Sequence, residues 1–127
     1  MNPYELNRLA QVCYDTAKYN MNVPTATDMR LCKVCNDMYM AFKYGAAAML
    51  KYKGVEPSLS GTLSSLYNQL STFGITIAPE VIENLDKWSN IETISVPSHG
   101  ELLHTSMVCE ALLHDLHDVI NGIIKEV

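Results

Sequence analysis

The chain has 127 residues, of which 48% are hydrophobic, and a formal net charge of −5 at pH 7. This length and composition fit one folded domain, residues 1–127, and argue against a disordered chain. The acidic balance argues against general nucleic-acid binding, because phosphate binding depends on clustered Lys and Arg. No apolar run approaches the ~18 residues that span a bilayer, and no signal peptide is recognisable. We therefore expect a cytoplasmic protein that does not contact membranes.

The first predicted helix begins at Pro3. Asn2 can cap it, proline is favoured at the first helical position, and Glu5 occupies the capping-box position. The apolar residues that follow recur at helical spacing: Leu6, Leu9, Cys13 and Ala17. The segment 20–24 ends this helix.

A long second helix is predicted from Asp28 to Lys53. Its inward stripe consists of Leu31, Val34, Cys35, Met38, Phe42, Ala46 and Met49. Gly45 lies on the same side, where it would permit a close crossing with another helix. Gly54 suits the position just after the helix, because glycine readily adopts positive φ.

Three further helices are predicted in the second half of the chain. A third spans about 61–73, a fourth begins at Pro79, and the last begins with a capping box, Ser98 to Glu101, and continues to the C-terminus. The inward side chains of the third helix are Leu63, Leu66, Leu70 and Phe73. The isolated β-prone patch 93–96 does not predict a sheet.

Short links between helices favour antiparallel neighbours. The predicted fold class is therefore all-α, an antiparallel up-and-down bundle of about five helices with a four-helix-bundle core. The second and the last helix have the longest apolar stripes, so we expect both at the centre of the bundle.

Cys32 and Cys35 form a C-x-x-C pair, while Cys13 and Cys109 lie on predicted inward stripes. A redox pair sits at a helix N-terminus, whereas this pair lies about one turn inside the second helix. A structural zinc site needs a second pair of ligands, which the sequence does not offer. We interpret the four cysteines as reduced thiols that act as small hydrophobic residues.

The last helix carries three histidines, His104, His114 and His117. His114 and His117 are three residues apart, so they share one side of the helix with Glu110. That side lies opposite the apolar stripe and should face solvent or a partner. Di-iron bundles use inward Glu-x-x-His pairs on two helices, so we expect no metal site. Nucleotide-binding glycine motifs and a nucleophile elbow are also missing, and we expect no cofactor.

Two helices have apolar residues outside their predicted inward stripes. They are Met40, Tyr44 and Ala47, next to Lys51, in the second helix, and Leu103 and Met107 in the last. Such residues either are scattered surface positions or form a contact surface. The charge is also uneven, with five cations against two acids in 28–53, and nine acids against two lysines in 80–127. Pairing of these faces across a two-fold axis would give a homodimer.

The segment CNDMYMAFKYGAAAMLKYKGVEPSLSGTLSSLYNQL, residues 35–70, resembles the helical HEPN domains of prokaryotes. Members have a long alanine-rich second helix that ends in a Lys-Gly turn, a short loop with proline, and a leucine-rich third helix. The order and lengths of the five helices also agree over nearly the whole chain. The resemblance implies the fold and dimerisation.

Catalytic HEPN ribonucleases have an Arg followed four to six residues later by His near the last helix. Here neither Arg8 nor Arg30 has such a histidine, and the acidic residue common in the middle of the second helix is replaced by Lys43. The resemblance thus implies a non-catalytic role, as an accessory subunit of a minimal nucleotidyltransferase or as a binder of a nucleotide-like ligand. The candidate ligand-binding residues are Lys43, Tyr44, Lys51, His104 and His114, and we assign no catalytic residue.

The sequence leaves open two alternatives to the accessory role. One is a degenerate HEPN ribonuclease or toxin in which His104 or His114 is the general base. The other is a helical bundle that binds a small ligand or a metal ion.

Overall fold

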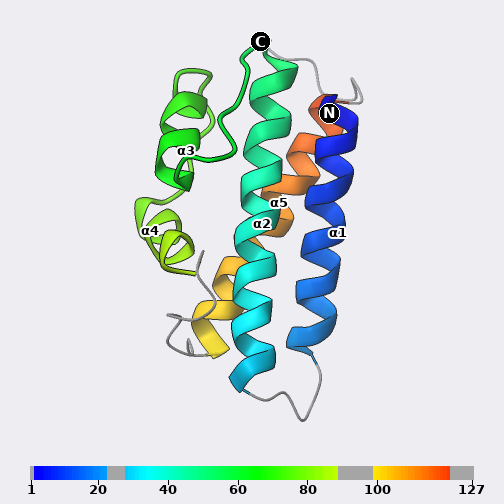
Figure 1. The fold of residues 1–127 in the computed structure, drawn as a ribbon, viewed down its shortest axis with the longest axis vertical. Helices are drawn as coiled ribbons and strands as arrows, with labels where there is room; N and C mark the ends of the chain where they lie inside the picture. Colours follow the sequence, from blue (N-terminus) through cyan, green and yellow to red (C-terminus); the bar gives the residue numbers. More distant parts are fainter. Residues whose placement is uncertain (1, 23–27, 89–98, 121–127) are drawn as a thin grey trace.

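The computed structural model describes residues 2–22, 28–88 and 99–120. They form five helices: α1 (Pro3–Met21), α2 (Asp28–Tyr52), α3 (Leu63–Ser71), α4 (Pro79–Lys87) and α5 (His99–Ile120) (Figure 1). No strand occurs within these ranges, so the all-α prediction is confirmed. The β-prone patch 93–96 and the Ser98 cap lie outside the described residues. In the described part of the chain, no helix is both long and apolar enough to cross a bilayer.

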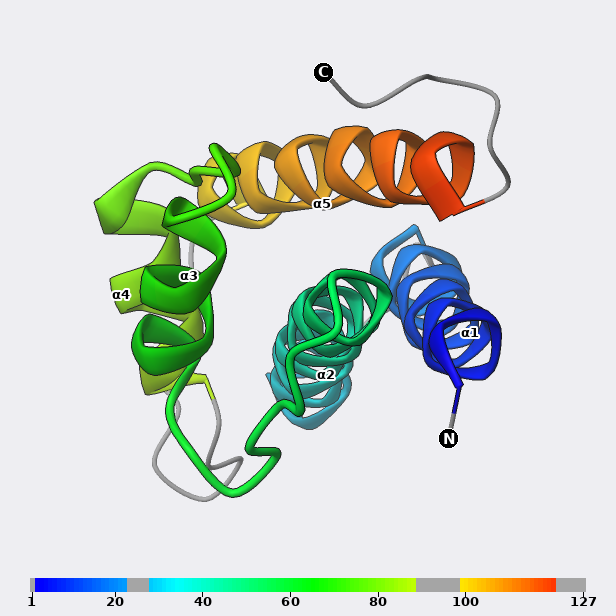
Figure 2. The same ribbon diagram turned by 90° about the horizontal axis from the view of Figure 1, so that it is seen from above.

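Helix α2 is the centre of the bundle, because it packs against each of the other four helices. Helix α1 lies antiparallel beside it, and these two share the most extensive contact. Figure 2 shows α5 crossing both of them obliquely, with the short α3 and α4 on the side of α2 away from α1. Helix α5 contacts α1 and α2. Of the two helices expected at the centre, only α2 packs against all four other described helices.

The predicted outward face of α2 is wrong in part. Ala47 is fully buried, while Met40 and Tyr44 are half-buried and pack against the core. The sequence pattern assumed one inward stripe, but a helix with neighbours on three sides buries most of its circumference. The exposed positions predicted on α5 are confirmed, since Leu103 and Met107 are 46% and 62% exposed.

The helix ends agree largely with the predicted capping residues. The Asn2 side chain accepts a hydrogen bond of 2.8 Å from the Glu5 backbone N–H at the start of α1. Gly54 and Gly74 have φ of 83° and 81°, which only glycine adopts without strain. Helix α3 begins at Leu63, two residues later than predicted from Gly61, because Thr62 caps it through the Ser65 N–H.

Phe73 was expected to point inward but is 39% exposed. Helix α3 ends at Ser71, so the chain has left helical geometry before it reaches Phe73. The ring instead lies 5.5 Å from the Lys53 ammonium, within range of a cation–π contact.

Two polar contacts position the short helices. Asp86 of α4 caps α3, accepting hydrogen bonds from the Leu63 N–H at 2.9 Å and from the Ser64 hydroxyl at 2.8 Å. A carboxylate suits the positive end of a helix dipole. The buried Tyr67 hydroxyl of α3 donates to the Phe42 carbonyl of α2 at 3.0 Å. These contacts attach α4 to α3 and α3 to the central helix.

Gly45 lies where α2 and α5 cross, as its position on the inward stripe predicts. A Cβ at this position would lie 3.4 Å from Leu113 Cδ2 and 3.8 Å from Leu116 Cδ2. These are ordinary contacts with the flexible ends of side chains, so one methyl group fits and a larger side chain does not.

We predict that Gly45→Ala raises the free energy of unfolding by about 0.5–1 kcal/mol, because alanine has the higher helix propensity. Gly45→Leu should lower it by about 1–3 kcal/mol through overpacking against α5. Urea denaturation followed by circular dichroism measures both changes. If both substitutions lowered the stability equally, the position next to α5 would not have room for the one methyl group that we infer at Gly45.

Candidate binding groove between α1 and α5

A groove of about 460 Å³ opens between α1 and α5. Its lining comes from Gln11, Tyr14, Asp15 and Lys18 of α1 and from Glu110, Leu113, His114, His117 and Asp118 of α5. All but two of these side chains are polar or charged. The groove thus brings together charged and titratable side chains from both helices.

The base of the groove is formed by buried residues that join the two helices. Tyr14 and Leu113 are 3% and 2% exposed. The Tyr14 hydroxyl lies 3.4 Å from the Ser106 hydroxyl of α5. Burial raises the pKa of Tyr14 above its ordinary value, with a smaller lowering by the Ser106 hydrogen bond. Tyr14 is therefore a neutral phenol across the physiological pH range.

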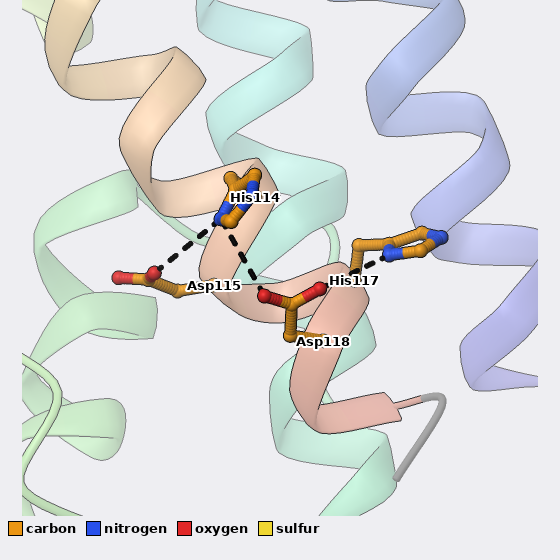
Figure 3. Close-up of polar contacts among 4 residues, drawn as sticks. All are labelled: His114, Asp115, His117 and Asp118. Atoms are coloured by element: carbon orange, nitrogen blue, oxygen red, sulfur yellow. Dashed lines mark hydrogen bonds and ion pairs between the residues drawn. The ribbon is translucent and has the colours of Figure 1, made fainter. Parts of the chain in front are cut away.

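His114 and His117 of α5 both contact the carboxylate of Asp118 (Figure 3). His114 Nδ1 lies 3.6 Å from Asp118 Oδ2, and His117 Nδ1 lies 3.5 Å from Asp118 Oδ1. The Asp118 side chain is 17% exposed, whereas the two imidazoles are 74% and 59% exposed. The predicted outward direction of this side of α5 is confirmed. A mostly covered carboxylate thus lies between two solvent-facing rings.

A second set of charges bridges the groove from α1. Lys18 Nζ lies 3.7 Å from Glu110 Oε1 and 5.9 Å from the centre of the Tyr14 ring. The Gln11 amide donates a hydrogen bond of 3.0 Å to Asp15 Oδ1. With neutral histidines, the lining carries three carboxylates, those of Asp15, Glu110 and Asp118, against one ammonium group. The groove is therefore negative at neutral pH.

The five predicted ligand-binding residues do not gather at one site. Lys43 Nζ lies 5.8 Å from the Tyr39 ring, and Lys51 Nζ is paired at 3.8 Å with Glu56. Tyr44 is half-buried, and His104 is exposed on α5. Of these five residues, His114 lines the α1–α5 groove. The other four are not part of its lining.

Sequence reasoning missed Lys18, Asp118 and the other α1 residues of the groove. Asp118 had a local signal, because it lies four residues after His114 on the same face. The α1 residues had none, since their proximity to α5 depends on the crossing of two distant helices.

A second groove, mostly apolar, lies between α2, the segment 74–77 and α5. Its volume is also about 460 Å³, and its walls include Met49, Ile75, Ile77, Val108, Leu112 and Val119. Asp115 is the only ionisable residue in its lining. In the described part of the chain, no group of three or more His, Cys, Asp or Glu side chains is arranged to hold a metal ion.

All four cysteines are free thiols. Cys35 and Cys109 are completely buried, as predicted, while Cys13 and Cys32 are only half-buried. Burial, followed by repulsion from the Cys32 position, raises the pKa of Cys35 to about 12. Burial also raises the pKa of Cys109 and of Cys13. A redox pair needs a lowered thiol pKa, so Cys35 acts as a core residue.

In comparisons with known proteins, no family model, no curated protein and no solved structure matched this chain. The HEPN-like resemblance therefore remains a prediction.

We predict that iodoacetamide at about pH 8 does not label Cys35 or Cys109 in the folded protein, because both thiols are buried and protonated. Cys13 and Cys32 should react slowly, and all four should react once guanidinium unfolds the chain. Mass spectrometry of tryptic peptides measures each site. Rapid formation of a Cys32–Cys35 disulfide in folded protein would instead support a redox pair.

Proposed function

We propose that this protein is a cytoplasmic, non-catalytic HEPN-like accessory domain that binds a basic surface of a partner protein through the α1–α5 groove. The resemblance favours a minimal nucleotidyltransferase as this partner. The observation that supports binding of a basic surface is the charge of the groove, with three carboxylates against Lys18.

A partner Lys or Arg would find acceptors already positioned in this groove. Asp118 is mostly covered, so its charge is screened less by salt than that of a fully exposed carboxylate. The exposed Lys18–Glu110 pair contributes only about 0–1 kcal/mol by itself, so Glu110 can exchange its partner at little cost. The phosphates of a nucleotide-like ligand would meet the same carboxylates and be repelled. We therefore favour the protein partner over the nucleotide.

The histidine geometry also favours binding over catalysis. A general base works when a neighbouring group holds its ring in one orientation through a good hydrogen bond. Here His114 Nδ1 lies 3.6 Å from Asp118 Oδ2, beyond the usual hydrogen-bond distance. The side chains of His114 and His117 are also 74% and 59% exposed, so neither ring is shielded from water.

We predict that an octalysine peptide binds the purified protein and that ATP does not, as measured by isothermal titration calorimetry. Binding should weaken at least about threefold when NaCl rises from about 50 to about 200 mM, because the attraction is between charges. The double substitution Glu110→Gln with Asp118→Asn should weaken it by about tenfold or more. Glu83→Gln, an exposed acid of α4 outside the groove, is the matched control.

Two results would contradict this proposal. One is tight binding of ATP with none of octalysine. The other is an equal loss of octalysine affinity in the Glu83→Gln control, which would indicate attraction to the acidic surface as a whole.

The ribonuclease alternative has one specific observation in its favour. His114, His117 and Lys18 line the same groove. Two imidazoles can act as base and acid in phosphodiester cleavage, while an ammonium group offsets the developing charge.

A cleavage assay with a fluorescent single-stranded RNA separates the two functions. The accessory proposal predicts no cleavage above that of a mock purification from cells without the gene. A ribonuclease would cleave, and His114→Ala or His117→Ala would lower the rate about 100-fold or more. Loss of cleavage only in His104→Ala would place the base outside the groove, at the other predicted histidine.

A further inference from the structure

No helix of the described ranges 2–22, 28–88 and 99–120 packs on the outer face of helix α1. Tyr4, Val12 and Tyr19 are large apolar residues that are 57%, 55% and 74% exposed. Arg8 and Asp15, which are also exposed, lie between them. These five residues are spaced by three or four positions, so they form one stripe along the helix. Figure 2 shows α1 at the edge of the bundle, with α2 and α5 on its inner side.

The order of residue types in this stripe is self-complementary when it is read in opposite directions. From Tyr4 to Tyr19 it reads aromatic, cation, aliphatic, anion, aromatic. A second α1 laid antiparallel on the stripe would place Tyr4 opposite Tyr19 of the second copy. The same register places Arg8 opposite Asp15 of the second copy, and Val12 next to the two-fold axis. One antiparallel register thus pairs aromatic with aromatic residues and cations with anions, and it brings the two aliphatic residues together.

We propose that this α1 stripe is the interface of a homodimer in which two α1 helices pack antiparallel. A second copy fits better than an unrelated partner, because a two-fold axis generates both Arg–Asp pairs from a single sequence. The proposal moves the predicted dimer contact away from α2, where Ala47 is fully buried and Tyr44 packs against the core. It does not depend on the function of the groove.

The second copy also adds a residue at the edge of the α1–α5 groove. Asp15 belongs both to the stripe and to the lining of the groove. Its Oδ1 accepts a hydrogen bond from Gln11, and Arg8 of the second copy would approach the carboxylate from the outer side. Dimerisation would therefore lower the negative charge of each groove.

The dimer should be weak and reversible. The stripe runs about 24 Å along one helix. A contact confined to this stripe buries less surface than the ~1,200 Å² typical of a stable interface. Exposed ion pairs set the register more than the affinity, so the two tyrosines and Val12 must supply most of the attraction.

Sedimentation velocity over a concentration series tests the interface by charge reversal. Arg8→Asp and Asp15→Arg should each raise the dimer dissociation constant by about tenfold or more, because each places like charges opposite one another. The double variant Arg8→Asp with Asp15→Arg should restore self-association. An equimolar mixture of the two single variants should form heterodimers, since both cross pairs are then complementary.

Met107→Glu on α5 is the matched control, and circular dichroism checks that each variant is folded. This control should leave the dimer intact. Three results would each overturn the proposal. They are loss of the dimer in Met107→Glu alone, failure of the double variant to restore self-association, and a wild-type protein that stays monomeric to millimolar concentration.

Discussion

Close packing around α2 is the constraint on which the other features of this fold depend. Ala46, Ala47 and Ala48 are at most 1% exposed, and Gly45 meets Leu113 of α5 directly. Small side chains let four helices approach one central helix, and the apolar area buried there is the main source of stability. Helices α1 and α5 both pack against α2, and they also contact each other. The groove lies along this contact between α1 and α5.

Helix α1 presents three kinds of surface around its circumference. Its inner residues, such as Leu6 and Ala10, are buried against the core. One flank supplies Lys18 and Asp15 to the groove, and the adjoining outer side carries the exposed stripe from Tyr4 to Tyr19. A short amphipathic helix at the edge of a bundle can thus connect a binding site with self-association, because neighbouring faces share residues such as Asp15.

The electrostatics of the groove favour one of the two functions that the resemblance implies, the binding of a protein partner. A phosphate ligand would need a surplus of cations, and the lining has the opposite surplus.

The sequence by itself determined the features that depend on neighbours within a turn or two. The cap at Asn2, the positive φ of Gly54 and Gly74, the five helices and the outward direction of His114 all follow from spacings of three to five residues. Tertiary structure alone decided that Ala47 is buried, that Asp86 caps α3, and that Tyr14 meets Ser106, 92 residues away. The physical reason is that helical periodicity fixes which residues share a face, whereas the packing of whole helices fixes which faces meet. The groove is made of such a meeting. Sequence reasoning singled out Glu110, His114 and His117 on α5, but not the α1 residues that face them.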